Sequence, residues 1–278
     1  MSKKHKRIIQ AFIIYVVLSI GTIAMVLPFL WMFFSSFKDA NSIFSYPPKW
    51  LPDKWNFKNY IDVWKIVPLG RWFLNSILIA GTVTVGILFG SSLAAYAFAK
   101  LKFVGNKILF TILLATMMIP YQVILIPMFL LMRNLGWVNT FKPMIIPSFA
   151  GSAFGIFLLR QFIMQMPQDL FDAARIDGAN EGFIFLKIIL PLLKPAMATL
   201  GLFTFIGSWN DLINPLIYLY DIEKYTLPLG LTFFQTQYAG FWHYLMAGSV
   251  ISIVPIIIVF FFTQNYFVEG IKLSGLKG

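Results

Sequence analysis

Residues 166–195 read MPQDLFDAARIDGANEGFIFLKIILPLLKP, and this polar segment lies between two long apolar runs. Four of the 11 acidic residues of the chain fall between Asp169 and Glu181. A buried charge without a partner is costly, so these acids need water or another protein surface. The segment therefore indicates a surface region in an otherwise hydrophobic protein.

The segment carries the start and stop signals of two short helices. Pro167 suits the first position of a helix, and Asp169 lies in the first turn, where the helix dipole favours an anion. Gly178 suits the C-terminal cap of this helix, and Asn180 can cap a second one. Pro191 interrupts the second helix because proline has no backbone N–H. The pattern predicts a helix, a turn and a second helix.

The first of these helices has a face with little side-chain bulk. Ala173 and Ala174 would let another surface approach closely. Asp177 lies near the helix end, where the dipole disfavours an anion, which leaves it to cap the second helix or to face a cationic partner. The alternative is a solvated surface loop in which Asp172 and Arg175 form an ordinary pair three residues apart. The residues alone leave both interpretations open.

Composition indicates whether the chain folds in water or in a lipid bilayer. The 278 residues are 59% hydrophobic and 12% charged, with a mean hydropathy of +0.77. A soluble domain carries about 25% charged residues, so we expect an all-α polytopic membrane protein of one domain. The chain has no cysteine, which excludes disulfide and thiolate chemistry. The net charge of +11 fits anionic lipid better than nucleic acid, which is not an expected partner.

Six segments are long and apolar enough to cross a bilayer, which needs about 20 residues. The first follows a basic stretch and is too long for a signal peptide, so we expect an uncleaved span. The predicted spans are residues 8–34, 73–99, 108–131, 144–163, 197–218 and 245–267. The expected divisions are a basic tail (1–7), a first span with a long outer loop (8–71), a five-helix core (72–268) that includes 166–195, and a C-terminal tail (269–278).

Basic residues predict the orientation. They are dense in the N-terminal tail, near Lys100 and along residues 160–194, and they are diluted by acids in the long loop at 35–72. Cytoplasmic loops carry the excess of Lys and Arg. Both termini and the loop at 166–195 are therefore expected to be cytoplasmic.

Several motifs carry a resemblance to a known family. DAARIDGAN (172–180) and LPLLKP (190–195) resemble the cytoplasmic coupling loop of permease subunits in ATP-binding-cassette importers, the Glu-Ala-Ala…Gly motif. RWFLNSI, FIGSWNDLINPL and YTLPLGL resemble carbohydrate-importer permeases, and the end FFTQNYFVEGIKLSGLKG is similar to the smaller permease of maltose-type and oligosaccharide systems. The likeness covers residues 28–278. Two departures are Asp172, where the family usually has Glu, and the Leu-Ser-Gly-Leu of the tail.

The resemblance implies a type I importer permease fold of about six transmembrane helices, in which the coupling loop docks in a cleft of a cytosolic ATPase subunit. It implies a second permease subunit, two ATPase subunits that hold ATP and Mg, an extracytoplasmic sugar-binding protein and a multi-pass place in a bacterial cytoplasmic membrane. The residues implied at the ATPase are Asp172, Ala173, Ala174, Arg175, Asp177, Gly178, Ala179, Leu190 and Pro191. The tail implied to reach between the ATPase subunits is Ser274, Gly275, Leu276, Lys277 and Gly278.

The chain has no phosphate-binding motif of the form Gly-x-x-x-x-Gly-Lys-Ser/Thr, so it is expected to bind no cofactor itself. His5 and His243 lie far apart in the sequence and on opposite sides of the predicted membrane, so we expect no metal site. No nucleophile elbow or zinc-protease motif is present, and we predict no catalytic residues. The energy for transport would come from a partner subunit.

A polar group interrupts the fifth predicted span at Trp209, Asn210 and Asp211. An acid inside a membrane is costly and often functional. One interpretation places Asn210 and Asp211 against sugar hydroxyls and Trp209 against a sugar face. The other has Asp211 cap or brace a helix end before Pro215.

The last outer loop, from Asp221 to His243, has a polar tip. In the family that the chain resembles, this loop enters the sugar cleft of the binding protein. The alternative is a turn with aromatic residues at the membrane interface. The tip consists of Gln235, Thr236, Gln237, Tyr238 and Gly240.

Two other classes of protein compete with the importer permease. A membrane-embedded glycosyl or prenyl transferase would need a carboxylate pair for a metal-bound diphosphate, and the acids between Asp169 and Glu181 are its candidates. A stand-alone ion-coupled transporter would need an ion site or an inverted repeat, and the sequence shows no repeat. The sequence does not identify the sugar that an importer would carry.

Overall fold

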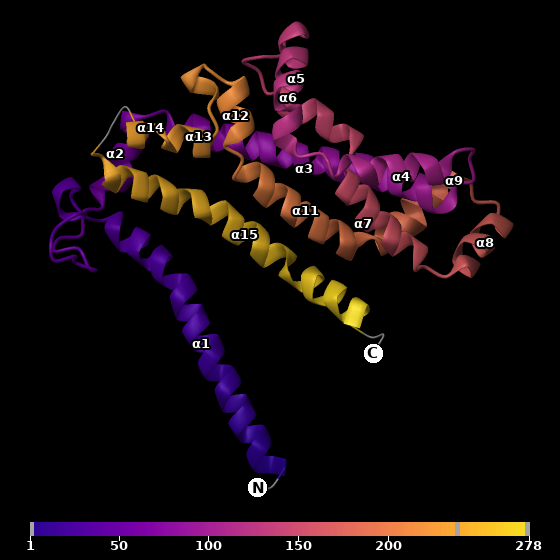
Figure 1. The fold of residues 1–278 in the computed structure, drawn as a ribbon, viewed down its shortest axis with the longest axis horizontal. Helices are drawn as coiled ribbons and strands as arrows, with labels where there is room; N and C mark the ends of the chain where they lie inside the picture. Colours follow the sequence, from indigo (N-terminus) through magenta and orange to yellow (C-terminus); the bar gives the residue numbers. More distant parts are fainter. Residues whose placement is uncertain (1–2, 237–239, 276–278) are drawn as a thin grey trace. The chain divides into compact units, whose positions relative to one another are not determined.

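The structure of the protein, a computed structural model, describes residues 3–236 and 240–275 (Figure 1). Every regular element in these two ranges is a helix, which confirms the all-α prediction. The chain divides into two compact units. One unit comprises Met1–Leu69 and Leu231–Val254, and the other comprises Gly70–Gly230 and Pro255–Gly278.

The first unit contains a long N-terminal helix and several short elements. Its elements are α1 (Lys3–Ser35), η1 (Ala40–Ser42), α2 (Lys58–Ile66), α14 (Phe233–Thr236) and the first part of α15 (Trp242–Gly275).

The second unit begins one residue into the long helix α3 (Leu69–Lys100) and contains most of the remaining elements. They are α4 (Asn106–Thr116), α5 (Tyr121–Asn134), α6 (Lys142–Ile145), η2 (Ile146–Ala150), α7 (Ala153–Met164), α8 (Gln168–Ile176), α9 (Glu181–Phe183), η3 (Ile184–Ile189), α10 (Leu190–Leu192), α11 (Lys194–Trp209), α12 (Ile213–Tyr218), η4 (Ile222–Lys224), α13 (Leu227–Leu231) and the end of α15.

Part of the predicted outer loop at 35–72 is folded within the first unit. The Lys38 side chain is buried, and its Nζ donates to the carbonyl oxygen of Lys49 at 2.5 Å. The same nitrogen lies 4.1 Å from the ring centroid of Trp31. Asn59 donates from Nδ2 to the carbonyl oxygen of Ser36 at 2.8 Å. The segment after α1 is therefore fixed by buried polar contacts as well as by α2.

The second unit has a hydrophobic core that joins its membrane helices to the segment at 166–195. Tyr96 of α3, Leu159 of α7, Phe171 of α8, Ile189 of η3 and Leu200 of α11 all belong to one buried cluster. Because α8 contributes a fully buried phenylalanine, this helix is part of the folded unit and not a loosely attached loop.

The predicted count of six spans is reached only if bent helix pairs are included. Among the described residues, four helices are long and apolar enough to cross a membrane. They are Ile9–Ser35, Leu69–Lys100, Lys142–Met164 and Trp242–Gln264. Two further pairs qualify together but are bent, Asn106–Thr116 with Tyr121–Asn134 by 99° and Glu181–Leu192 with Lys194–Trp209 by 73°.

Two predicted spans differ from the helices of the structure. The span predicted at 108–131 breaks between Thr116 and Tyr121, where Pro120 has extended backbone (ψ 136°). The span predicted at 197–218 ends at Trp209, and a separate helix, α12, begins at Ile213. Hydropathy could not reveal the first break, because the residues on both sides are apolar, whereas the polar residues Asn210 and Asp211 lie at the second.

A close backbone contact fixes the start of α7 on α3. A Cβ atom at Gly90 would lie only 2.5 Å from the backbone nitrogen of Gly151, so glycine is needed for this approach. Gly151 has a φ of +81°, a value that favours glycine. The hydroxyl of Ser91 accepts a hydrogen bond from the backbone N–H of Ser152 at 3.1 Å. This contact places Ser152 beside the cavity described below.

Candidate functional site

Two helix caps predicted from the sequence, at Gly178 and Asn180, are present in the segment at 166–195. Helix α8 ends with the backbone N–H of Gly178 donating to the Arg175 carbonyl at 3.1 Å and that of Ala179 donating to the Ala174 carbonyl at 3.0 Å. This pair of bonds is a Schellman motif, and Gly178 has the positive φ, +81°, that it requires. Pro167 precedes the helix as its N-cap, one position earlier than predicted.

The second predicted helix begins as expected and then departs from a regular α-helix. Asn180 Oδ1 accepts from the backbone N–H of Phe183 at 2.8 Å, which confirms the predicted cap. After α9 the chain forms the π-helix η3. Helix α10 then begins at Leu190, with Pro191 in its first turn. No sequence signal had indicated the π-helical turns, which often mark functional sites.

Helix α8 has a buried face and an exposed face. Phe171 is 0% exposed, and Ala174 packs against the same core. Ala173 points away from that core and is exposed. Ile176 is 86% exposed although it is apolar. Since Asp172, Ala173 and Ile176 are spaced for one helix side, α8 offers a face of one acid, one minimal side chain and one apolar side chain.

The structure brings Asp172 and Arg175 together, as the solvated-loop alternative expected, but extends the contact into a network. Arg175 Nη2 lies 3.0 Å from Glu181 Oε1, and its Nη1 lies 3.5 Å from Asp172 Oδ1. Gln168 Nε2 donates to Asp172 Oδ1 at 3.1 Å, and Lys100 Nζ donates to Gln168 Oε1 at 3.0 Å. Hydrogen bonding to Glu181 raises the pKa of the Arg175 guanidinium above its ordinary value.

Tyr96 anchors this network in the protein interior. Its ring is 5% exposed and lies 5.5 Å from the ring of Phe185, centroid to centroid. Its hydroxyl donates to the Glu181 carboxylate. On the next turn of α3, Lys100 Nζ lies 3.7 Å from the ring centroid of Phe171. We call Tyr96, Lys100, Gln168, Asp172, Arg175 and Glu181 the loop network.

A hollow of about 470 Å³ lies where α8 turns into α9. Four of the residues predicted at the ATPase line this hollow, namely Ala174, Asp177, Gly178 and Ala179. In the described part of the chain, the Asp177 side chain has no hydrogen bond or ion pair, so its carboxylate is available to a partner. Leu190 and Pro191 are not among the lining residues.

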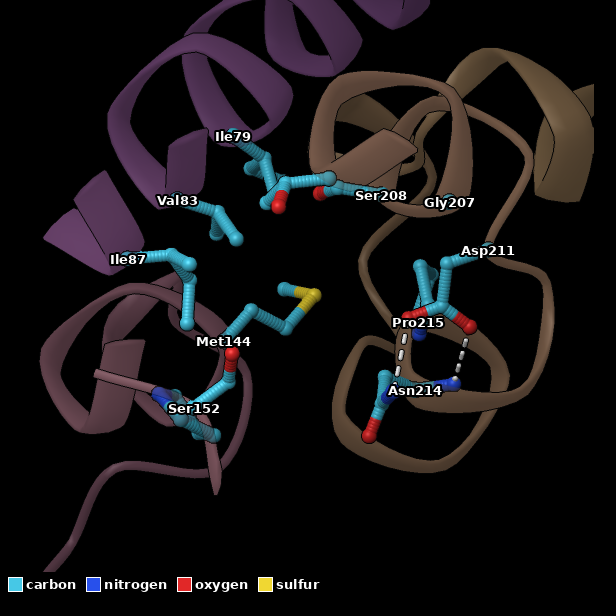
Figure 2. A pocket seen from close by; sticks show the side chains of 12 residues that line it. Ile79, Val83, Ile87, Met144, Ser152, Gly207, Ser208, Asp211, Asn214 and Pro215 are labelled. Carbon is cyan, nitrogen blue, oxygen red and sulfur yellow. Dashed lines mark hydrogen bonds between the residues drawn. The ribbon is translucent and has the colours of Figure 1, made fainter. Parts of the chain in front are cut away.

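A second candidate site is a cavity of about 350 Å³ between α3, the α6–α7 region and α11–α12 (Figure 2). Figure 2 shows apolar side chains of α3 and Met144 on one side and Asp211 with Asn214 on the other. The lining residues are Ile79, Val83, Ile87, Pro143, Met144, Ser152, Thr204, Gly207, Ser208, Asp211, Asn214 and Pro215.

Asp211 caps a helix end, as one of the two sequence interpretations proposed. Its Oδ1 accepts from the backbone N–H of Asn214 at 3.1 Å, and its Oδ2 accepts from Asn214 Nδ2 at 2.6 Å. Asn210 is the exposed C-terminal cap of α11. Trp209 does not line the cavity, is 1% exposed and packs between Phe73 and Phe205. The predicted stacking of a sugar on Trp209 therefore does not fit, because the indole has no open face.

The remaining predicted residues lie apart from both sites or outside the described ranges. Ser274 and Gly275 belong to α15, which continues beyond the span predicted at 245–267. Leu276, Lys277 and Gly278 lie outside the described residues, as do Gln237 and Tyr238. In the last outer loop, Gln235 is exposed, Thr236 ends α14, and Gly240 has a φ of +106°.

Sequence reasoning missed several residues of these sites. Ile176 could have been noticed as an apolar residue off the buried face of its helix. Tyr96 and Glu181 are 85 positions apart, and no local pattern links them. Thr204 and Ser208 are spaced one turn apart on α11, on the cavity wall, but small hydroxyl residues are common in membrane helices.

The amino-acid sequence matches known proteins over most of its length. A family described as "Binding-protein-dependent transport system inner membrane component" matches residues 86–273. The arabinooligosaccharides transport system permease protein AraQ of Halalkalibacterium halodurans is 40% identical over 207 residues, which are 74% of this chain and 74% of that protein. The trehalose/maltose transport system permease protein MalG of Thermococcus litoralis is 33% identical over 271 residues, which are 95% of this chain and 97% of that protein.

The fold also matches a solved structure. A chain in the crystal structure of a bacterial ABC transporter involved in the import of the acidic polysaccharide alginate superposes with a TM-score of 0.84 at 28% sequence identity. The match covers 96% of this chain and 99% of that chain.

Proposed function

The chain belongs to the family of binding-protein-dependent transport system inner membrane components, and on this premise we propose that it is a permease subunit of an ATP-driven sugar importer. It is a multi-pass membrane protein. The observation that carries the proposal is that relatives matching nearly the whole chain are named as permeases for maltose, trehalose and diacetylchitobiose. An oligosaccharide is therefore the expected cargo.

The exposed face of α8 is the proposed contact with a cytosolic ATPase subunit, which would hold ATP and Mg. Ala173 permits close approach, Ile176 adds apolar area, and Asp172 supplies a charge for a cationic side chain. Burying a large aliphatic side chain such as Ile176 favours association by about 1.5–3 kcal/mol. Ile176 is 86% exposed, so nearly all of its side-chain surface is free to be buried in such a contact.

The loop network is the proposed route from this contact to the transport pathway. Tyr96 and Lys100 belong to α3, whose other end lines the cavity through Ile79, Val83 and Ile87. From Tyr96 to Ile87 the helix rises about 14 Å at 1.5 Å per residue. A helix held at one end by hydrogen bonds and by core packing moves as a rigid body, so displacement of α8 would shift the cavity wall.

The other partners are proposed from the family. The chain would pair with a second permease subunit in a bacterial cytoplasmic membrane and receive sugar from an extracytoplasmic binding protein. The tip at Gln235–Gly240 would contact that binding protein, and the tail at 274–278 would reach the ATPase subunits.

Orientation can be tested with single cysteines, because the native chain has none. Tyr46 is 96% exposed in the segment after α1, so Tyr46→Cys should react with a membrane-impermeant thiol reagent in intact cells. Gly182→Cys, in the loop at 166–195, should react only after the cells are opened. The reverse pattern would refute the proposed orientation.

The function itself is tested by uptake in a strain that lacks this chain. Radiolabelled arabinotriose, maltotriose, trehalose and diacetylchitobiose are supplied to the strain with and without a plasmid copy of the gene. We expect the plasmid to restore ATP-dependent uptake of at least one of the four sugars. If none enters faster with the plasmid, although the protein is present in the membrane, the proposed function is wrong.

A further inference from the structure

The cavity of Figure 2 has an unbalanced charge. Its lining residues in the described part of the chain include the carboxylate of Asp211 and no Lys, Arg or His. The cavity lies among helices of the membrane part, where charges are weakly screened. An anion entering this cavity would therefore meet a like charge that has no counter-ion on the wall.

The Asp211 carboxylate is fixed in place. Both of its oxygens accept from Asn214, one from the backbone and one from the side chain. Asn214 is itself held from the far side, because its Oδ1 accepts from the Tyr121 hydroxyl. The carboxylate cannot swing out of the cavity without losing the cap of α12.

Asp211 also keeps capacity for a ligand. Each carboxylate oxygen has two acceptor sites, and the protein uses one on each. A neutral hydroxyl can donate to the remaining sites, whereas another carboxylate cannot. The cavity therefore distinguishes a sugar hydroxyl from a sugar acid by hydrogen bonding as well as by charge.

The wall beside Asp211 supplies further groups for a neutral sugar. In the described part of the chain, neither the Thr204 hydroxyl nor the Ser208 hydroxyl has a hydrogen-bond partner. Both project from α11 on the turns that precede Asp211. Across the cavity, Val83 and Ile87 form an apolar wall (Figure 2). Hydroxyl-bonding groups facing an apolar wall suit the two kinds of surface on a sugar ring.

We propose that this cavity binds neutral saccharides on their way through the membrane and that Asp211 excludes sugars carrying a carboxylate. The inference rests on the proposed function and adds the substrate class. Specificity of this kind adds a repulsive element to the favourable hydrogen bonds.

The expected discrimination is large enough to measure. Two like charges about 6 Å apart at an effective dielectric constant of about 20 repel enough to weaken binding roughly 100-fold. Replacing the carboxylate with an amide removes the repulsion. Asparagine can still accept hydrogen bonds from Asn214, so the α12 cap is retained in part.

The experiment measures selectivity in the complete importer. The probes are whichever of arabinotriose, maltotriose, trehalose and diacetylchitobiose is taken up fastest and the same sugar with one primary alcohol oxidised to a carboxylate. The ratio of neutral to acidic uptake is compared between the wild type and Asp211→Asn. The binding protein is the same in both strains, so its own preference cancels. We expect the ratio to fall at least tenfold, and Asp62→Asn in α2 should leave it unchanged.

Each outcome decides a separate question. The acidic probe is one that the purified binding protein is first shown to bind. An equal ratio in the wild type and Asp211→Asn then overturns the inference, and so does a variant that takes up no acidic probe. If the wild type takes up none of the four neutral sugars, the proposed function fails instead. Because Asp211→Asn could disturb α12, its amount in the membrane is measured by immunoblot.

A second variant tests the cavity without altering its charge. Thr204→Val with Ser208→Ala removes the two hydroxyls and should lower neutral uptake roughly tenfold, since two hydrogen bonds to the sugar are lost. Thr199→Val on the same helix is the matched control, because the Thr199 hydroxyl bonds the Pro195 carbonyl and does not line the cavity. Equal uptake by the double variant and the control would contradict sugar binding here.

Discussion

Two aspartates show how differently the same side chain is held in the two candidate sites. Asp172 lies on the exposed face of α8, where its carboxylate accepts from Gln168 and pairs with Arg175. Asp211 lies in the break between α11 and α12, where its carboxylate accepts from the backbone and side chain of Asn214. The first is held by side chains at a surface, and the second is built into a turn on a cavity wall.

The different hydrogen-bond partners of Asp172 and Asp211 fit two different roles. An exposed ion pair contributes only about 0–1 kcal/mol, so Asp172 can exchange Arg175 for a cation on another subunit at little cost. Asp211 cannot exchange its partners without unwinding the start of α12. Asp172 therefore suits a contact that forms and breaks. Asp211 suits a negative charge that is held at one place beside the proposed path of the sugar.

The largest expected effect comes from blocking the face that carries Asp172. Ala173→Trp should reduce sugar uptake roughly 100-fold, because a large ring on a closely packed interface costs about 1–3 kcal/mol or more. The fold should tolerate the change, since Ala173 points away from the core. Uptake and copurification of the ATPase are measured together. Gln165→Trp, at an exposed position outside α8, is the control, and equal loss in both would argue against a docking face.

The charge of Asp172 itself should have a smaller effect. Asp172→Arg places a cation beside Arg175 and opposite the proposed cation of the ATPase, and it should lower uptake about 30-fold, in line with about 2 kcal/mol. Asp172→Glu keeps the charge and should stay within about twofold of the wild type, because a flexible side chain can still reach a surface cation. Wild-type uptake and ATPase binding by Asp172→Arg would mean that the loop is a solvated connector.

Removing one hydroxyl from the loop network should separate ATP hydrolysis from transport. Tyr96→Phe loses a hydrogen bond to a carboxylate, worth about 1.5–3 kcal/mol, so the sugar carried per ATP hydrolysed should fall about tenfold. The ring still packs on Phe185, which preserves the core. Hydrolysis and uptake are measured in proteoliposomes. Tyr15→Phe, on the exposed part of α1, is the control. Uptake that falls only in proportion to hydrolysis would show that Tyr96 transmits nothing.

The cap of the second loop helix should give the smallest effect. Asn180→Ala removes one side-chain acceptor and should cost about 1 kcal/mol of folding free energy. In a domain of this size that lowers the melting temperature by about 2 to 4 °C. Thermal unfolding of the purified protein in detergent measures the change. Asn180→Asp restores an acceptor, and its melting temperature should be close to that of the wild type. A larger shift for Asn180→Asp than for Asn180→Ala would contradict the cap.

The sequence predicted features that depend on neighbouring residues. Gly178 and Asn180 were assigned as caps because their backbone and side-chain preferences act within one helical turn, and both assignments are confirmed. The all-α class followed from hydropathy for the same reason, since each span is a local property. Asp211 was recognised as notable because an acid is rare inside an apolar run.

Features that depend on distant residues could not be predicted. The bond between Tyr96 and Glu181 joins α3 to α9, and it exists only because α3 shares a core with η3, which follows α9. The buried position of Trp209 depends on Phe73 of another helix. The hydroxyls of Thr204 and Ser208 likewise line a cavity only because α11 faces α3 in the folded chain. Hydropathy treats a bent pair of helices as one run, so it also missed the break after Thr116.

The central claim is that the exposed face of α8 contacts the ATPase, and site-specific cross-linking tests it most directly. Ala173→Cys, which adds little bulk, is introduced into the cysteine-free chain, and the assembled importer is oxidised with copper phenanthroline against single cysteines placed one at a time on the surface of the ATPase subunit. We predict that at least one of these cysteines forms a disulfide with Ala173→Cys and that Gln165→Cys gives much less product. Absence of the cross-linked product at Ala173→Cys, or labelling of that cysteine from outside intact cells by an impermeant reagent, would contradict the account.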